Sequence, residues 1–184
     1  MTTTKGYNQL HLNALFDLYS KRYVDAVIQL ARKENESLAM THMIDRYSGE
    51  KKTIFIADRG YETYNIFAHV QEKGMYYLIR VKDGGGGSMT GSFHLPEKDE
   101  FDHAMHLLIT RKKTNEVKAH PEIYKILDKK SPFDYVDLHE RHFYPMDFRV
   151  VRFTITESSY ECIITNLPQA EFPMDEIKKF YAMR

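Results

Sequence analysis

The sequence predicts an α/β fold in which helices cover a mixed sheet and an antiparallel β subdomain is inserted. Residues 53–81 follow the order strand, helix, strand with a short return, which is typical of a parallel βαβ unit. Residues 7–30 and 101–110 alternate apolar and polar side chains, as antiparallel strands with one buried face do. Residues 83–88 contain four consecutive glycines and read as a flexible linker between the two parts.

The first part opens with a predicted β-hairpin over residues 7–30. One face of the hairpin is apolar and is expected to be buried, and its members are Leu10, Leu12, Ala14, Phe16, Val24, Ala26, Ile28 and Leu30. Asn35 is a typical N-cap residue, and the apolar spacing after it predicts an amphipathic helix that ends near residue 48.

The βαβ unit places an acidic residue at the end of a strand. An apolar strand over residues 53–57 is followed by Asp58, a helix over residues 62–73 and a buried strand over residues 75–81. Open α/β sheets bind ligands at the carboxyl ends of their strands, so Asp58 is a candidate catalytic residue. A strand-ending aspartate also commonly caps the following turn, and the spacing alone leaves both interpretations open.

The second part contains the predicted strands 101–110, 148–156 and 161–167. These strands indicate an antiparallel β subdomain inserted into the α/β framework. A final helix begins near residue 172 and places Ile177, Phe180, Tyr181 and Arg184 on neighbouring faces.

Composition limits the function classes. The chain has 184 residues with 26 basic and 26 acidic side chains, so its net charge does not indicate a nucleic-acid partner. Residues 111–130 are locally basic, with seven Lys or Arg against three acidic residues. The single cysteine, Cys162, excludes an internal disulfide and is expected to pack as a small apolar side chain. No run is apolar enough for a membrane helix and no signal peptide is present, so a soluble intracellular protein is expected.

The nine histidines do not form a metal-binding pattern. His103 and His106 are three residues apart on a predicted strand, which places them on opposite faces. Residues 139–142 miss the zinc-protease spacing by one residue. Ordinary surface or half-buried histidines are therefore expected.

The chain resembles the DDE transposases of bacterial insertion sequences whose carboxyl-terminal signature is Tyr-x2-Arg-x3-Glu-x6-Lys. The block Ile56-Ala-Asp-Arg-Gly-Tyr61 is similar to the segment that holds the second catalytic aspartate of that family. Tyr181 and Arg184 match the start of the signature, and residues 5–17 and 75–82 are similar to strands on either side of the Asp58 block.

This resemblance implies a ribonuclease H-like mixed sheet and a DNA-cleaving and strand-joining activity. It implies that Asp58 is a catalytic and metal-binding residue, with two Mg2+ or Mn2+ ions in the complete enzyme. It implies that the partner is double-stranded DNA of transposon ends, in the bacterial cytoplasm near the nucleoid and away from membranes, with a possible homodimer. The expected DNA-binding residues are Arg59, Tyr181 and Arg184, and in the basic region Arg111, Lys112, Lys113 and Lys118.

The chain departs from the family pattern at both ends. The first catalytic aspartate would precede residue 5, and the catalytic glutamate would fall four residues after Arg184. We therefore expect an incomplete ribonuclease H-like core over residues 1–82, the inserted β subdomain over residues 83–170, and the start of the signature helix over residues 171–184. One catalytic carboxylate out of three leads us to expect an inactive fragment of a transposase.

The missing first strand would lie between the hairpin and strand 53–57. Two repairs are possible: residues 7–17 could pair directly with residues 53–57, or a neighbouring chain could supply a strand. Two other functions also stay open. One is a non-catalytic DNA-binding or oligomerisation module, and the other is a metal-dependent nuclease unrelated to transposition.

Overall fold

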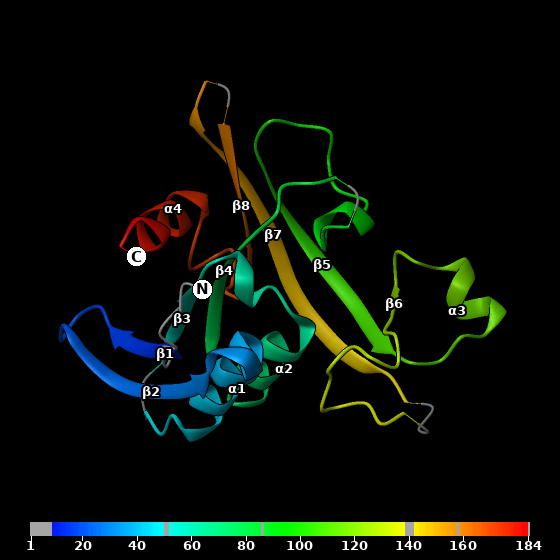
Figure 1. Cartoon of the computed structure of the whole chain (residues 1–184). Helices are drawn as coiled ribbons and strands as arrows, with labels where there is room; N and C mark the ends of the chain where they lie inside the picture. The colour runs from blue at the N-terminus through cyan, green and yellow to red at the C-terminus, as the bar shows by residue number, and fades with distance from the viewer. Residues whose placement is uncertain (1–8, 50–51, 86, 139–141, 158, 184) are drawn as a thin grey trace, which may run out of the picture.

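The computed structural model describes residues 9–49, 52–85, 87–138, 142–157 and 159–183. Within these residues the strands form two sheets (Figure 1). Strands β1 and β2 form a sheet of two, and the other strands form a six-stranded mixed sheet in the order β3-β4-β8-β7-β5-β6. The α/β class and the mixed sheet with helices are therefore confirmed, in agreement with a ribonuclease H-like domain.

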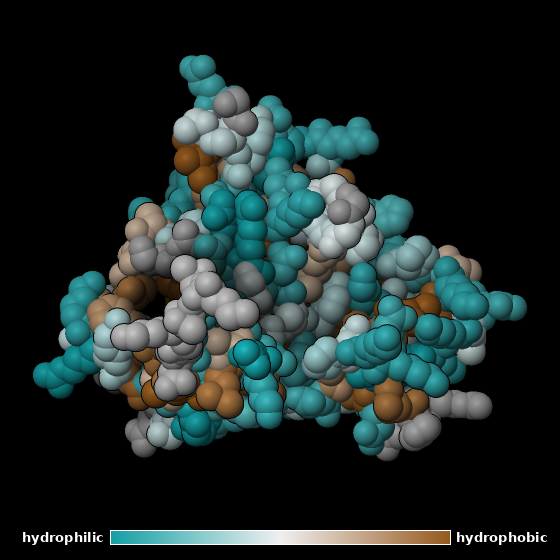
Figure 2. Space-filling model, viewed as in Figure 1, coloured by the Kyte–Doolittle hydropathy of each residue, from teal (hydrophilic) through white to brown (hydrophobic). Residues whose placement is uncertain are grey.

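The hairpin forms as predicted, but its exposed face is the opposite of the expected one. Strands β1 (Leu10–Asp17) and β2 (Arg22–Leu30) pair antiparallel. The apolar side chains Leu12 and Ile28 are 62% and 66% exposed, whereas Asn13 is buried at 4%. Alternation determines which residues share a face, and only tertiary packing determines which face is covered. Figure 2 shows hydrophobic side chains at the surface where the hairpin lies.

The predicted helix and βαβ unit are confirmed. The Asn35 side chain accepts a hydrogen bond from the Leu38 backbone and caps helix α1 (Glu36–Arg46), which follows the 3-10 turn η1 (Ala31–Lys33). Strand β3 (Ile54–Ala57) leads through the 3-10 turn η2 (Arg59–Tyr61) and helix α2 (Tyr64–Glu72) to strand β4 (Tyr76–Val81). Strands β3 and β4 pair in parallel. Gly74 ends this helix with a φ of 63°, which glycine adopts without strain.

The later strands extend the same sheet and do not form one of their own. Strand β8 (Ser159–Thr165) pairs with β4, β7 (Tyr144–Thr156) pairs with β8, and β5 (Phe101–Thr110) pairs with β7. Three short elements were not predicted from the sequence: 3-10 turn η3 (Thr90–Ser92), helix α3 (Asn115–Ala119) and edge strand β6 (Tyr124–Ile126). The proposed division at residues 82 and 170 stays a prediction.

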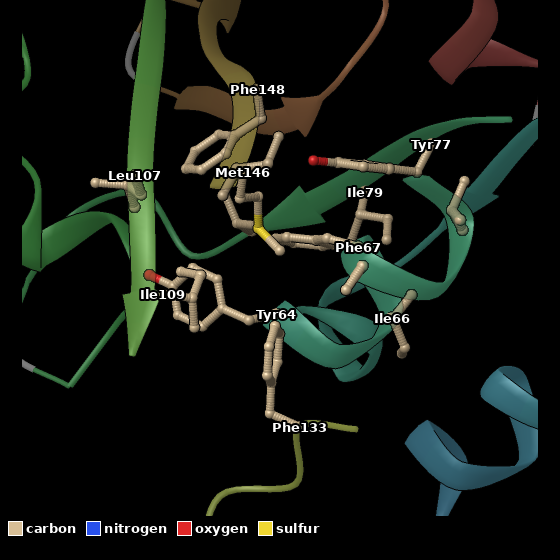
Figure 3. Packing of buried hydrophobic residues seen from close by; sticks show 14 of the residues in the cluster. Tyr64, Ile66, Phe67, Tyr77, Ile79, Leu107, Ile109, Phe133, Met146 and Phe148 are labelled. Carbon is tan, nitrogen blue, oxygen red and sulfur yellow. The ribbon is translucent and has the colours of Figure 1, made fainter. Parts of the chain in front are cut away.

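Apolar side chains cover both faces of the six-stranded sheet. On one face α1 and α2 pack over a cluster in which the rings of Phe67 and Tyr77 stack with centroids 4.7 Å apart (Figure 3). On the other face helix α4 (Met174–Ala182) buries Ile177 against Leu78 and Ile163. Cys162 is 1% exposed, so its predicted place in the core is confirmed.

Strand β3 is at the edge of the described sheet, so the central position expected for the strand that ends at Asp58 is not found. It pairs with β4 alone among the strands of the described ranges, and β1 is not its neighbour. The direct closure of residues 7–17 onto residues 53–57 is therefore not found. Pairing with a neighbouring chain stays a prediction.

Candidate active site

Asp58 lies directly after β3, where it caps the following turn. Its Oδ1 accepts a hydrogen bond from the backbone N–H of Arg59 at 2.8 Å. The capping interpretation is thus correct. The Asp58 side chain is 54% exposed, so its carboxylate remains accessible to a ligand.

Strand alternation directs Asp58 to the face of the sheet that α4 covers. Ile54 and Ile56 pack against the apolar cluster beneath α4, and Asp58 continues this series of every second residue. Leu78 belongs to the same cluster, so alternation directs Arg80 to the same face. Because β3 and β4 are parallel neighbours, the two charged side chains meet at the carboxyl ends of both strands.

Arg80 links Asp58 to a second carboxylate. Its Nη1 lies 3.6 Å from Asp58 Oδ1, and its Nε forms an ion pair with Glu161 Oε2 on the next strand, β8. Glu161 is buried, whereas the Arg80 side chain is 24% exposed. Burial lowers the pKa of the Arg80 guanidinium, but Tyr181, Glu161 and Asp58 raise it, and the net shift is upward.

Tyr181 of helix α4 lies on the same face of the sheet, and we call the place where Asp58, Arg80 and Tyr181 lie the corner. It lies in the last turn of α4, is 9% exposed, packs in the apolar cluster that contains Leu78, and raises the pKa of the Arg80 guanidinium. The structure therefore brings Asp58 and Tyr181 to one shared neighbour, although they are far apart in the sequence. Arg59 is exposed beside Asp58, and Arg184 lies outside the described residues.

The comparison with known families decides the identity of the domain. The family model of the transposase DDE domain matches residues 1–184. The chain belongs to the transposase DDE domain family. A search among curated proteins finds no significant match to this DDE domain.

The described side chains do not form a metal site at Asp58. DDE transposases generally use divalent metal ions, which carboxylate oxygens bind well. No cluster of three or more His, Cys, Asp or Glu side chains suited to a metal ion occurs in the described ranges. A guanidinium, that of Arg80, faces Asp58, and the nearby carboxylate of Glu161 is turned to that same guanidinium.

The four predicted DNA-binding residues of the basic region are one arginine and three lysines. Arg111 donates hydrogen bonds to the backbone carbonyls of Asp128, Val136 and Ser131 at 2.6, 3.0 and 3.0 Å. Its guanidinium therefore holds the 128–136 loop, and its use as a DNA-binding residue stays a prediction. Lys118 is exposed on α3, Lys113 forms an exposed 3.5 Å ion pair with Asp128, and Lys112 Nζ lies 5.3 Å from the Phe143 ring centroid.

Sequence reasoning missed Arg80 and Glu161. Arg80 is the one charged residue of β4, and this feature of the sequence could have identified it as a candidate site residue. Its position next to Asp58 follows only once β3 and β4 are paired in parallel, and its link to Glu161 needs the long-range pairing of β4 with β8.

None of the helices in the described ranges is long and apolar enough to cross a membrane.

A pocket of about 430 Å³ lies away from this corner, beneath the glycine-rich segment. Phe93, Lys98 and Arg152 are among its lining residues. Arg152 is held there by Asp83 at 2.9 Å and by the Tyr160 ring at 3.9 Å, so its charge stabilises the loop. The carboxyl ends of β3 and β4, and not this pocket, therefore form the candidate active site.

Proposed function

We propose that this DDE domain acts in the transposition of an insertion sequence, in metal-dependent cleavage and strand transfer of DNA. Membership of the transposase DDE family supports the reaction class. The observation that supports the location is the corner where Arg80 joins Asp58 from β3 and Tyr181 from α4.

The side chains of this corner suit a DNA backbone. A guanidinium binds phosphate oxygens through two parallel N–H groups, so Arg80 is the group that would hold a phosphate beside Asp58. Tyr181, whose hydroxyl oxygen is buried, would line the same phosphate site, and the exposed Arg59 would contact a neighbouring phosphate. Asp58 is the proposed catalytic carboxylate, and we propose Arg184 as a further DNA contact on the signature helix.

The divalent ions proposed for this activity are Mg2+ or Mn2+, and the transposon end is the proposed DNA partner. Because no cluster of three or more His, Cys, Asp or Glu side chains suited to a metal ion occurs among the described residues, we assign no reaction step to such an ion. Lys112, Lys113 and Lys118 are proposed to bind DNA without sequence preference at a second surface.

The test is the affinity of the chain for a fluorescent 30-base-pair duplex, measured by anisotropy. We expect Arg80→Gln to weaken binding about tenfold, as loss of a charge-assisted phosphate contact should. Tyr181→Phe should weaken binding by a smaller factor. Arg32→Gln, an exposed arginine beyond the hairpin, is the matched control and should change little.

Wild-type affinity in the Arg80→Gln and Tyr181→Phe variants would contradict this active-site assignment. Thermal unfolding by circular dichroism should accompany each variant, so that a loss of affinity is compared only between folded proteins.

A second candidate function is a DNA-binding or oligomerisation module without catalysis. The exposed apolar face of the hairpin favours it, because soluble monomers rarely leave large contiguous apolar patches uncovered. If this face joins two copies, sedimentation should show a dimer that Leu12→Lys and Ile28→Lys convert to a monomer. A wild-type monomer at all concentrations would exclude this role for the hairpin.

A further inference from the structure

One guanidinium at the candidate active site faces two carboxylates that arrive from different strands. Arg80 on β4 stands between Asp58 at the end of β3 and Glu161 on β8. The order β3-β4-β8 makes these strands neighbours, and Arg80 pairs with Ile163, two residues from Glu161, so the three side chains lie on one face of the sheet. Two of them are acidic and one is basic.

The two carboxylates hold Arg80 unequally. Glu161 forms the closer ion pair, and its side chain is only 10% exposed. Asp58 is 3.6 Å from Arg80, and its side chain is 54% exposed. An ion pair between exposed groups is weak because water screens it, whereas a buried charge depends on its partner. Glu161 therefore sets the position of Arg80, and Asp58 is the partner that can exchange.

This arrangement has a consequence for cations that approach Asp58. A divalent cation bound to Asp58 Oδ1 would stand next to the fixed positive charge of Arg80. Like charges at such distances repel each other strongly when one of them cannot move away. Arg80 and a metal ion thus compete for the same carboxylate oxygen.

We propose that Arg80, positioned by Glu161, is a built-in counter-ion of Asp58 that competes with divalent cations for its carboxylate. Glu161 is a positioning residue in this account, since it acts on Asp58 only through Arg80. The inference rests on the proposed function in treating Asp58 as the catalytic carboxylate. It adds that two side chains of this chain, Arg80 and Glu161, limit the binding of divalent cations to Asp58.

The test uses Mn2+ as the probe and the full chain labelled with 15N. Bound Mn2+ broadens nearby amide signals, so the signals of Ala57 and Gly60 report on Asp58 without any measurement of activity. Removing the competing charge with Arg80→Gln should lower the Mn2+ concentration at half broadening by about tenfold. Glu161→Gln should leave this concentration unchanged or raise it, because Arg80 then has Asp58 as its remaining charged partner. Arg80→Lys keeps the charge and should stay close to the wild type.

Two controls separate this account from a general change in charge or folding. Arg59→Gln removes one positive charge next to Asp58 in sequence and should shift the midpoint by less than about twofold. Asp58→Asn should abolish the effect of Arg80→Gln. All variants are compared by their thermal unfolding curves.

The proposal is overturned if Arg80→Gln does not tighten Mn2+ binding, or if Glu161→Gln tightens it equally. The second result would mean that loosening the corner, and not removing the competing charge, exposes Asp58. DNA is absent from this measurement. A negative result for Mn2+ binding would therefore not affect the DNA-binding test of the proposed function. A negative result of the DNA-binding test would likewise not affect the inference about Mn2+.

Discussion

Asn65 and Asp134 contact each other twice across 69 residues of sequence. Asn65 Nδ2 donates to Asp134 Oδ2 at 2.9 Å, and the backbone N–H of Asp134 donates to Asn65 Oδ1 at 2.9 Å. His69, one helical turn further along α2, lies 2.9 Å from the same carboxylate oxygen and 2.7 Å from Asp45. These contacts hold the loop that follows β6 against helix α2.

The first prediction concerns the stability of this attachment. Asn65→Ala should lower the free energy of unfolding by about 1–3 kcal/mol, because it leaves the Asp134 backbone N–H without its hydrogen-bond acceptor. Urea denaturation measures the change. Asn115→Ala, at an exposed position on α3, is the control and should stay within about 0.5 kcal/mol of the wild type. Equal stability of the two variants would contradict the role given to Asn65.

Acid should release the same loop. The hydrogen bond from Asn65 and the contact with His69 hold the pKa of Asp134 below its ordinary value, although partial burial opposes them. A carboxyl group with a lowered pKa in the folded state stabilises the protein above its unfolded pKa. That stabilisation is lost as the pH falls through the lowered, folded value. Unfolding measured from pH 6 down to pH 2 should show this loss in the wild type, and the loss should be smaller in Asn65→Ala.

The third prediction concerns Arg111, whose guanidinium donates hydrogen bonds to backbone carbonyls of the 128–136 loop. Arg111→Ala should cost about 2–3 kcal/mol, since it leaves several backbone carbonyls without a charged donor. Trypsin should then cut faster after Lys129 and Lys130 in the native state. Lys113→Ala removes only an exposed ion pair and should cost less than about 0.5 kcal/mol. If Arg111→Ala leaves both stability and cleavage unchanged while DNA affinity falls, Arg111 is a DNA-binding residue after all.

The lysines of the basic region lead to a prediction about salt. If Lys112, Lys113 and Lys118 each neutralise a phosphate, the slope of log affinity against log salt should include about −0.9 from each. Replacing all three by alanine should flatten the slope by about 2–3, again at about 0.9 per contact. Anisotropy titrations between 50 and 200 mM salt measure it. An unchanged slope would mean that these lysines are only solvated.

Local patterns in the sequence were enough to predict most of the secondary structure. Asn35 identifies a helix start, Gly74 identifies a helix end, and the apolar strands around α2 identify a parallel βαβ unit. Side-chain alternation did not show which face of the hairpin is covered, because that depends on what packs against it. Alternation of Leu12 and Ile28 looks the same whether their face is buried or exposed.

The candidate site was only partly accessible from the sequence for a similar reason. Asp58 could be found because it directly follows an apolar strand. Arg80 and Glu161 could not, because their positions depend on the pairing of β4 with β3 and β8. Arg111 looked like part of a charged run, and only the fold shows that its partners are backbone carbonyls.

We expect DNA to bind at the corner formed by Asp58, Arg80 and Tyr181. The most direct test is to map amide shifts of the 15N-labelled chain on addition of a short duplex. The largest shifts are expected at the ends of β3 and β4 and in the last turn of α4, with smaller shifts at α3. Shifts confined to α3 and its flanking lysines, with none at Asp58 or Arg80, would contradict it.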